Sequence, residues 1–183
     1  MPENFKVVRT GVRKKLWGIF PREVDYHLDI GTGKKNIAYN LIGRIRAKHR
    51  LCCEANEEKV SLMARYKPVF CGDALTLGAF VKEKLFDLVT ALDVIEHLEK
   101  RDGFKLLELI DSLCCGAAVV FTPFGELFMG NKGVKWEEHL SGWWPEDFEK
   151  YGYDCTVLKD FHNIKGKFYD ALLAVKNFGG KDG

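Results

Sequence analysis

The sequence lacks the features that mark membrane-spanning and exported chains. No apolar run approaches the roughly 18 residues of a membrane helix, and the opening residues, MPENFKVVRT, lack the apolar core of a signal peptide. The formal net charge is only +2, so overall charge does not indicate a nucleic-acid-binding protein. The 183 residues are 46% hydrophobic and 30% charged, which is typical of one folded domain spanning 1–183. We expect a cytoplasmic protein without a membrane partner.

The six cysteines do not form a pattern typical of a disulfide scaffold or a zinc site. Four of them are neighbours, at 52–53 and 114–115, and neighbouring side chains on a strand point to opposite faces. Cys71 and Cys155 are isolated, and no CxxC occurs. We therefore expect buried, reduced thiols and no metal site.

Short apolar runs alternate with amphipathic stretches along most of the chain. The expected strands are 24–30, 50–55, 68–71, 86–92 and 117–122, and the expected helices are 37–48, 57–66, 74–84, 102–113 and one that begins at 145. This alternation predicts an α/β fold, in which a mostly parallel sheet has helices on both faces. Two last strands, 154–158 and 168–175, are separated only by a loop and should pair antiparallel. A tail, 177–183, is expected to be disordered.

Acidic residues follow four successive strands of the predicted sheet. They are Asp29, Glu54, Asp73 and Asp93. In open α/β sheets, ligands bind outside the carboxyl ends of the strands. Any one of these acids could cap a helix, Asp73 especially. Four in the same kind of place indicate a ligand site.

Two glycines, Gly31 and Gly33, directly follow the first strand of this sheet. They permit a tight turn and the close approach of a ligand to backbone N–H groups. The dinucleotide fingerprint fails at its third glycine, where this chain has Asn36, and no Walker motif occurs. Glu54 can accept hydrogen bonds from both hydroxyls of a ribose, and Asp73 from an adenine amino group. These residues predict a site for an adenosine-containing cofactor.

Two histidines lie where chemistry is expected. Asp93, Glu96 and His97 directly follow a strand and could hold the amino-acid end of a cofactor, act as a general base or supply metal ligands, although His97 could equally start a helix and bond to the backbone. Because Glu96 and His97 are adjacent, they cannot form a chelate across one helical turn. His139 lies in a long segment, 124–144, and is either a general base or an exposed loop residue.

Together these motifs resemble those of the class I S-adenosylmethionine-dependent methyltransferases. The resemblance is carried by DIGTG (29–33), EAN (54–56), GDA (72–74), ALDVIEHL (91–98), AAVVFTP (117–123) and HLSGWWPEDFEKYGYD (139–154). It covers roughly residues 25–175. It implies a Rossmann-like, seven-stranded, mostly parallel sheet with an antiparallel final strand and helices on both faces.

The resemblance also implies which residues act. The cofactor-binding residues are then Asp29, Gly31, Gly33, Glu54, Ala55, Asn56, Asp73, Ala74, Asp93 and Val94, and the general-base candidates are Glu96, His97 and His139. Asp29 and Gly31 would lie by the methionine part of S-adenosylmethionine. Glu54 would hold the ribose and Asp73 the adenine, while Asp93 would line the wall near the sulfonium.

A small-molecule acceptor is the preferred interpretation. No NPPY-like tetrapeptide occurs, since TPFG stands at 122–125, and no catalytic cysteine motif is evident. Segments 1–24 and 124–144 should border the site as a lid, with one of Trp143 and Trp144 buried and the second near the site. The arm 1–24 is basic near its start, which leaves RNA open as an acceptor. A protein acceptor and a non-catalytic S-adenosylmethionine-binding module stay open as well. We expect a monomer or a homodimer.

Overall fold

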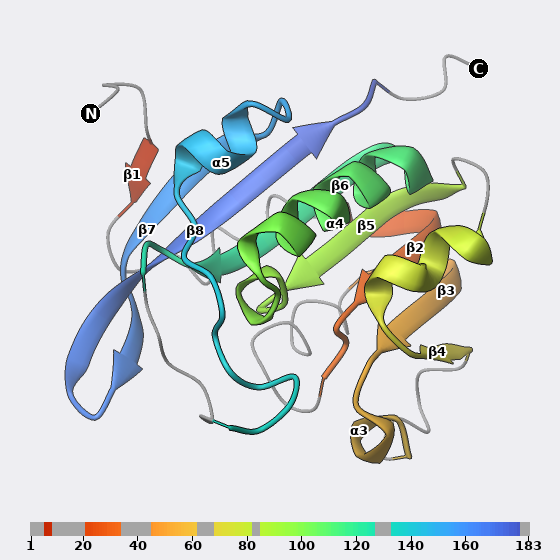
Figure 1. Ribbon diagram of the computed structural model, residues 1–183. Coiled ribbons are helices and arrows are strands. Elements are labelled where there is room, and N and C mark those ends of the chain that lie inside the picture. Colours follow the sequence, from red (N-terminus) through yellow and green to blue (C-terminus); the bar gives the residue numbers. More distant parts are fainter. Residues whose placement is uncertain are drawn as a thin grey trace.

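A single mixed sheet organises the molecule (Figure 1). The computed structural model describes residues 6–8, 21–33, 45–61, 68–81, 85–126 and 133–179. Across these ranges the sheet has eight strands in the order β1-β7-β8-β6-β5-β2-β3-β4. The strands are β1 (Lys6–Val8), β2 (Glu23–Ile30), β3 (Arg46–Glu54), β4 (Val69–Cys71), β5 (Phe86–Leu92), β6 (Cys114–Pro123), β7 (Asp154–Ile164) and β8 (Lys167–Asn177).

The sheet is parallel except around its last strand. β8 lies antiparallel to both β6 and β7, and every other pair is parallel. The seven strands β2–β8 confirm the predicted mostly parallel sheet with an antiparallel final strand. β1 is an additional edge strand that pairs with β7. It lies in the basic arm and was not predicted, because only three residues of it enter the sheet.

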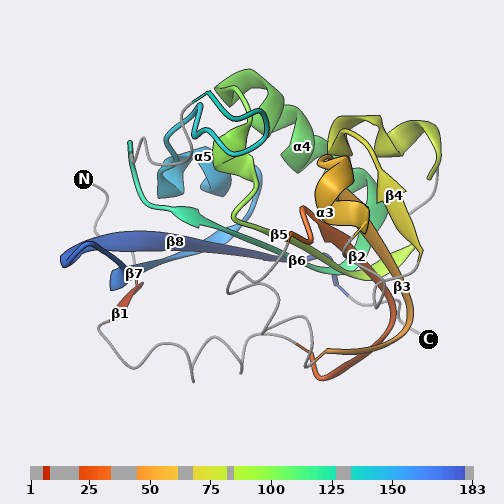
Figure 2. The ribbon, with the colours of Figure 1, turned by 90° about the horizontal axis from the view of Figure 1, so that it is seen from below.

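The helices of the described ranges are short except for one. They are α3 (Glu57–Ser61), α4 (Lys100–Leu113) and α5 (Pro145–Glu149), together with the 3₁₀ turns η1 (Ala74–Ala79) and η2 (Ile95–His97). In Figure 2, α4 and α5 lie over the same face of the sheet. Most of the predicted helix 37–48 falls outside the described residues. No helix within them is both long and apolar enough to cross a bilayer.

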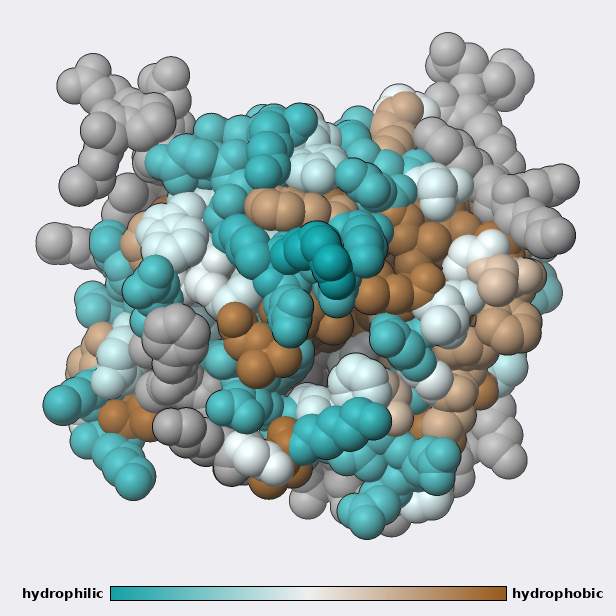
Figure 3. All heavy atoms as spheres, viewed as in Figure 1, coloured by the Kyte–Doolittle hydropathy of each residue, from teal (hydrophilic) through white to brown (hydrophobic). Residues whose placement is uncertain are grey.

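Both faces of the sheet bury apolar side chains. On the face under α4, Leu106 and Ile110 pack against strand residues such as Val89, and all three are at most 1% exposed. On the opposite face Leu88 and Phe121 belong to a second buried cluster. Full burial of one such side chain stabilises the fold by about 1.5–3 kcal/mol. The outer surface around α4 is largely hydrophilic, with apolar residues gathered between α4 and η1 (Figure 3).

Three of the boundaries that differ from the prediction are set by strand pairing. Residues 46–48, predicted to end a helix, are the start of β3, where Arg46 pairs with Glu23 of β2. The predicted loop between the last strands is instead a continuous hairpin that turns at Lys165 and Gly166, both with positive φ. β8 also runs to Asn177, inside the predicted tail. In each case pairing with a neighbouring strand satisfies the backbone of a polar segment that carries little apolar signal of its own.

The cysteines follow the predicted pattern of buried thiols in part, since Cys115 and Cys155 are half-buried. All six are free thiols, and those at 52, 53 and 114 are buried in strands. Cys71, at the end of β4, is exposed. The prediction of a buried thiol is therefore wrong at that position.

Gly103 of α4 offers a test of this packing. A Cβ added there would lie 2.3 Å from Cζ2 of Trp143, which is fully buried. Although alanine favours a helix by about 1 kcal/mol over glycine, overpacking of a rigid core costs about 1–3 kcal/mol. We expect Gly103→Ala to lower the free energy of unfolding, measured by urea denaturation. Ser112→Ala, at an exposed position of the same helix, should change it little, and equal effects would contradict the packing argument.

Candidate functional site

A cavity of about 450 Å³ opens where β2, β3, β4 and β5 end. This volume is within the range of small-molecule sites. Its lining comes from the loops after these strands and from the segment that follows β6. The lining residues are Ile30, Gly31, Gly33, Cys53, Glu54, Ala55, Lys59, Gly72, Asp73, Ala74, Asp93, Val94, His97, Leu98, Trp136, Glu137 and His139. The cavity therefore lies at the edge of the sheet where the acidic residues predicted it.

The loop after β2 requires glycine for a specific reason. Gly31 has φ +68°, and a Cβ added there would lie 2.2 Å from Cγ2 of Val94. The loop thus packs directly against the residue that follows β5. Gly33 also has a positive φ, and both glycines expose backbone to the cavity.

The carboxylate of Glu54 joins two loops at the cavity wall. Its Oε2 accepts from the N–H of Gly33 at 2.9 Å, and its Oε1 accepts from the N–H of Asn56 at 3.0 Å. Each carboxylate oxygen can accept a second hydrogen bond. Glu54 is therefore held rigidly with acceptor capacity to spare.

Two predicted cofactor residues turn out to cap helices. Asp73 Oδ1 accepts from the N–H of Leu75 at the start of η1, and Asp73 also lines the cavity beside Ala74. The Oδ1 of Asn56 accepts from the N–H groups of Glu58 and Lys59, and Asn56 is not among the lining residues. Asp73 therefore both caps a helix and lines the cavity, the two interpretations that the sequence left open. The side chain of Asn56 only caps a helix.

Asp29 lies beneath the loop, at the end of a buried chain of hydrogen bonds. Arg50 Nε donates to Nδ1 of His27, so the proton of the neutral imidazole is on Nε2, which lies 2.9 Å from Oγ1 of Thr90. Thr90 in turn donates to Oδ1 of Asp29 at 2.7 Å. Burial lowers the pKa of His27 to about 3, which keeps it neutral.

The second oxygen of Asp29 is buried without a hydrogen-bond partner. Burial raises the pKa of Asp29 to about 7. Asp29 does not itself line the cavity, although its neighbours Ile30 and Gly31 do. His27 and Thr90 were not predicted from the sequence, because they lie inside strands rather than at the ends of strands.

A second pair of acids follows β5, of which Glu96 is buried and Asp93 lines the cavity. Asp93 adopts φ +55°, a left-handed conformation that is uncommon for residues other than glycine. Burial raises the pKa of Asp93 to about 7. Glu96 is 2% exposed, and burial and the charge of Asp93 raise its pKa well above the ordinary value. Oε2 of Glu96 accepts from Oγ1 of Thr122 at 2.9 Å.

The three general-base candidates lie together. The ligand-type atoms of Glu96, His97 and His139 are all within 4.8 Å of one another, and the two imidazole rings meet edge to face with centroids 4.9 Å apart. Nδ1 of His97 lies 3.0 Å from the carbonyl oxygen of Glu138. Because a carbonyl only accepts, Nδ1 carries the proton and Nε2 keeps its lone pair. Burial lowers the pKa of His97, so the ring is neutral near pH 7. One carboxylate and two imidazoles can also hold a metal ion.

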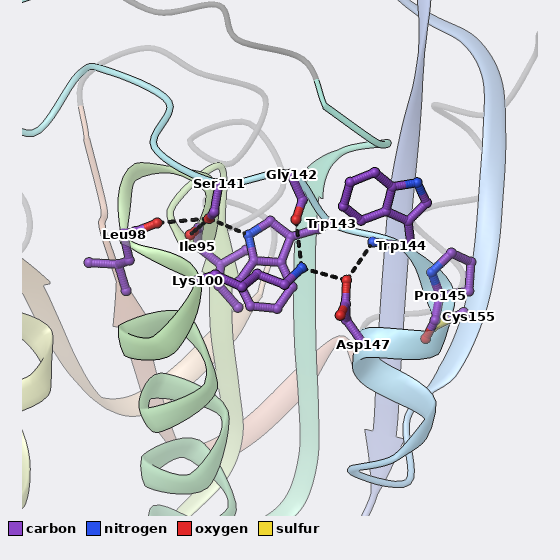
Figure 4. A network of polar contacts seen from close by, with 10 residues as sticks. All are labelled: Ile95, Leu98, Lys100, Ser141, Gly142, Trp143, Trp144, Pro145, Asp147 and Cys155. Carbon is purple, nitrogen blue, oxygen red and sulfur yellow. Dashed lines mark hydrogen bonds and ion pairs between the residues drawn. The ribbon is translucent and has the colours of Figure 1, made fainter.

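Backbone contacts bring His139 to this position. The carbonyl oxygen of Glu96 accepts from the N–H groups of Leu140 and Ser141 at 2.7 and 3.2 Å. The segment after them is anchored by Lys100, whose Nζ donates to the carbonyl of Gly142 and to Asp147 and lies 3.9 Å from the ring centroid of Trp143 (Figure 4). Segment 139–144 is therefore fixed to η2 and to the start of α4.

The aromatic prediction holds for one tryptophan and not for the other. Trp143 is fully buried, and its Nε1 donates to Oγ of Ser141. Trp144 does not line the cavity, whereas Trp136 does. Near Trp136 an ion pair of 3.2 Å joins Lys59 of α3 to Glu137. These contacts link positions far apart in the sequence, and no motif marks them. Three aromatic residues of the predicted lid segments, Trp17, Phe20 and Phe128, and most of the basic arm lie outside the described residues.

The fold and the position of the cavity define a class: α/β proteins that bind a ligand at the carboxyl ends of a central parallel sheet. Among solved structures, the chain is similar to an S-adenosylmethionine-dependent methyltransferase from Archaeoglobus fulgidus (18% identity, 90% of this chain and 93% of the other, TM-score 0.64). It is also similar to an S-adenosylmethionine-dependent methyltransferase from Clostridium acetobutylicum ATCC 824 (17% identity, 92% of this chain and 89% of the other, TM-score 0.60). A third similar structure is the small RNA methyltransferase HEN1 (14% identity, 90% of this chain and 24% of the other, TM-score 0.61).

No protein-family model and no curated protein matches the chain. The structural similarity nevertheless extends over nine-tenths of it. The chain has the fold of the class I S-adenosylmethionine-dependent methyltransferases, as its motifs predicted.

Asp29 makes stability depend on pH. Its pKa is about 7 in the folded chain against an ordinary value of 3.8, so between these pH values the folded state binds more protons than the unfolded state. The contribution of Asp29 to the free energy of unfolding therefore falls as pH rises from about 4 to 7, and it is constant above pH 7. We expect Asp29→Asn to remove about 2–4 kcal/mol of this decrease in the ligand-free protein, judged from urea denaturation across that range. Glu149→Gln, at an exposed position, serves as the control; parallel pH curves for wild type and Asp29→Asn would contradict the assignment.

Proposed function

We propose that this protein is a methyltransferase that uses S-adenosylmethionine and acts on a small-molecule acceptor. The observation that carries the proposal is the position of Glu54, held by the N–H groups of Gly33 and Asn56 at the wall of the cavity. An acid at the end of the second central strand, with free acceptor capacity, suits the two hydroxyls of a ribose. The shared fold of the solved methyltransferases supports the same conclusion.

The rest of the cavity fits the remaining parts of this cofactor. Gly31 and Gly33 line the cavity without side chains, so the methionine part of the cofactor can approach the backbone of this loop closely. The buried, unpartnered oxygen of Asp29 lies beneath that loop and suits an ammonium group. Asp73, Ala55 and Ala74 line the part of the cavity between β3 and η1, which we assign to the adenine. Asp93 and Val94 then face the sulfonium.

The chain's own residues have three tasks. S-adenosylmethionine supplies a methyl group that is already activated, so the protein must hold the acceptor in line and exclude water. Val94, Leu98 and Trp136 provide apolar lining for this purpose. His97, neutral and with its Nε2 lone pair available, is suited to take a proton from the acceptor. His139 and Glu96 are the remaining general-base candidates, and both lie beside His97.

S-adenosylhomocysteine should bind and stabilise the chain. A ligand that binds only the folded state adds about 2.7 kcal/mol at one hundred times its dissociation constant. We expect a rise in Tm with S-adenosylhomocysteine and none with NAD. Glu54→Gln should bind it at least tenfold more weakly, because the amide NH₂ must face the N–H of Gly33 or of Asn56 and one acceptor is lost.

Glu58→Gln, at an exposed position of α3, is the matched control for this measurement. Affinity is read by calorimetry, so that a general loss of stability is not mistaken for lost binding. Unchanged affinity in Glu54→Gln would show that Glu54 does not hold the ribose. A Tm shift with NAD and none with S-adenosylhomocysteine would overturn the cofactor assignment.

The acceptor class is tested by transfer of labelled methyl to cell extracts. We expect label in the low-molecular-weight fraction, unaffected by prior nuclease treatment. Nuclease-sensitive label would instead favour RNA, for which the similarity to a small RNA methyltransferase is the specific observation. Label retained on protein would favour a protein acceptor. Donor binding without label in any fraction would favour a non-catalytic binding module.

A further inference from the structure

We propose that Glu96, His97 and His139 bind a divalent transition-metal ion at the wall of the cavity, and that this ion binds a hydroxyl oxygen of the acceptor. The three side chains come from two segments that no sequence spacing connects, yet their ligand-type atoms lie within 4.8 Å of one another. Metal–ligand distances of about 2.0–2.2 Å place two ligands at most about 4.4 Å apart. The observed cluster is therefore close to the spacing of a bound ion.

Each of the two η2 ligands is already oriented by a second hydrogen bond. His97 donates Nδ1–H to the carbonyl of Glu138, which directs the lone pair of Nε2 away from that carbonyl. Thr122 donates to Oε2 of Glu96. Metal-binding histidines and carboxylates in proteins are oriented in the same way, by a carbonyl or hydroxyl behind the ligand. General-base catalysis needs only one oriented side chain, whereas this site holds both His97 and Glu96 in a fixed orientation.

The third ligand is supplied by a segment whose backbone is fixed to η2. The N–H groups of Leu140 and Ser141 both donate to the backbone carbonyl of Glu96, so the residue before them, His139, is fixed beside the residue that carries the carboxylate. Lys100 holds the next part of the same segment through Gly142 and Asp147 (Figure 4). The relative positions of the three ligands are thus determined by backbone contacts rather than by flexible side chains.

The charge of the site also fits a cation. Glu96 is 2% exposed, and Asp93, three residues before it, lines the cavity. Across the residues that the structure describes, neither acid forms an ion pair. Buried carboxylates are costly unless a cation or hydrogen bonds compensate them. A divalent ion between Glu96 and the histidines would supply that compensation.

The ligand set indicates which ions fit and what they would do. Imidazole nitrogens together with a carboxylate oxygen favour Mn²⁺ or Zn²⁺ over Mg²⁺, which prefers oxygen ligands and retains its waters. Three protein ligands leave coordination positions open, and His97 and His139 both line the cavity. An acceptor hydroxyl bound at an open position is acidified, as a metal-bound water is.

This role in the reaction rests on the proposed methyl transfer, and in it His97 binds the ion instead of acting as the general base. The bound hydroxyl loses its proton to solvent, and its oxygen forms a bond to the methyl carbon. The carbon–sulfur bond breaks, and its electron pair stays on sulfur. The products are a methyl ether and S-adenosylhomocysteine, so the acceptor class is an alcohol or a phenol.

Metal binding is tested on the full chain after removal of any affinity tag and dialysis against a chelator. Calorimetry with Mn²⁺ and with Zn²⁺ should show one ion per chain, and Mg²⁺ should bind more weakly. We expect His139→Ala to weaken Mn²⁺ binding at least tenfold. His49→Ala, which removes an exposed histidine at the far end of β3, should bind as the wild type does. No ion bound by the wild type, or equal binding by His139→Ala, would overturn the site.

Two further readouts separate this proposal from the proposed function. The Tm shift with S-adenosylhomocysteine should persist in His139→Ala, which shows that the variant is folded. Mn²⁺ bound to the wild type should show a line broadened by ¹⁷O-labelled water in electron paramagnetic resonance, because open positions hold water. No broadening would overturn the acceptor role. Metal binding without a Tm shift by S-adenosylhomocysteine would overturn the proposed methyl transfer but not the ion site. A Tm shift without metal binding would overturn the ion site but not the proposed methyl transfer.

Discussion

The pairing of β2 between β3 and β5 is the constraint on which the site depends. Asp29 is in register with Cys52 of β3 and with Thr90 of β5. Because the three strands run parallel, they end at one edge of the sheet, and the loops that follow them converge there. Glu54 can then reach back to the N–H of Gly33, 21 residues earlier, and Val94 can pack against Gly31. The cavity follows from this register rather than from any single motif.

A second constraint acts from the opposite side of the cavity. The backbone carbonyl of Glu96 accepts two N–H groups from the segment after β6, and Lys100 anchors the same segment between Asp147 and the face of Trp143. Cation–π contacts and ion pairs of partly buried groups are stronger than exposed ones, since less water competes. The wall that contains His139 is therefore attached to the residues after β5, although about 40 residues of chain lie between them.

Burial of acids accompanies this arrangement. Asp29, Asp93 and Glu96 all have raised pKa values, because the sheet edge and the loops exclude water from them. Such groups lower the stability of the ligand-free chain at neutral pH, and clusters of them are typical of functional sites. The ligands that we propose for this site would each bring positive charge to these acids: the ammonium and sulfonium groups of S-adenosylmethionine, and the metal ion.

Much of the site could be predicted from the sequence, because its signals are local. Apolar runs followed by an acid located the strand ends, and the spacing of Gly31, Gly33 and Glu54 predicted one wall of the cavity. Asn56 and Trp144 were expected at the site but do not line the cavity, since a sequence does not show which way a side chain points. His27 and Thr90 lie within strands, where a polar residue has no distinctive spacing.

The sequence by itself determined the α/β alternation, the glycine loop and the acids at the strand ends, because these depend on neighbouring residues and on the periods of helix and strand. Only the tertiary structure decided that His139 lies beside His97 and Glu96, that Trp136 lines the cavity, and that β1 joins the sheet. These outcomes depend on hydrogen bonds and packing between distant segments. No local pattern in the chain encodes them, because the partners meet only when the sheet has formed.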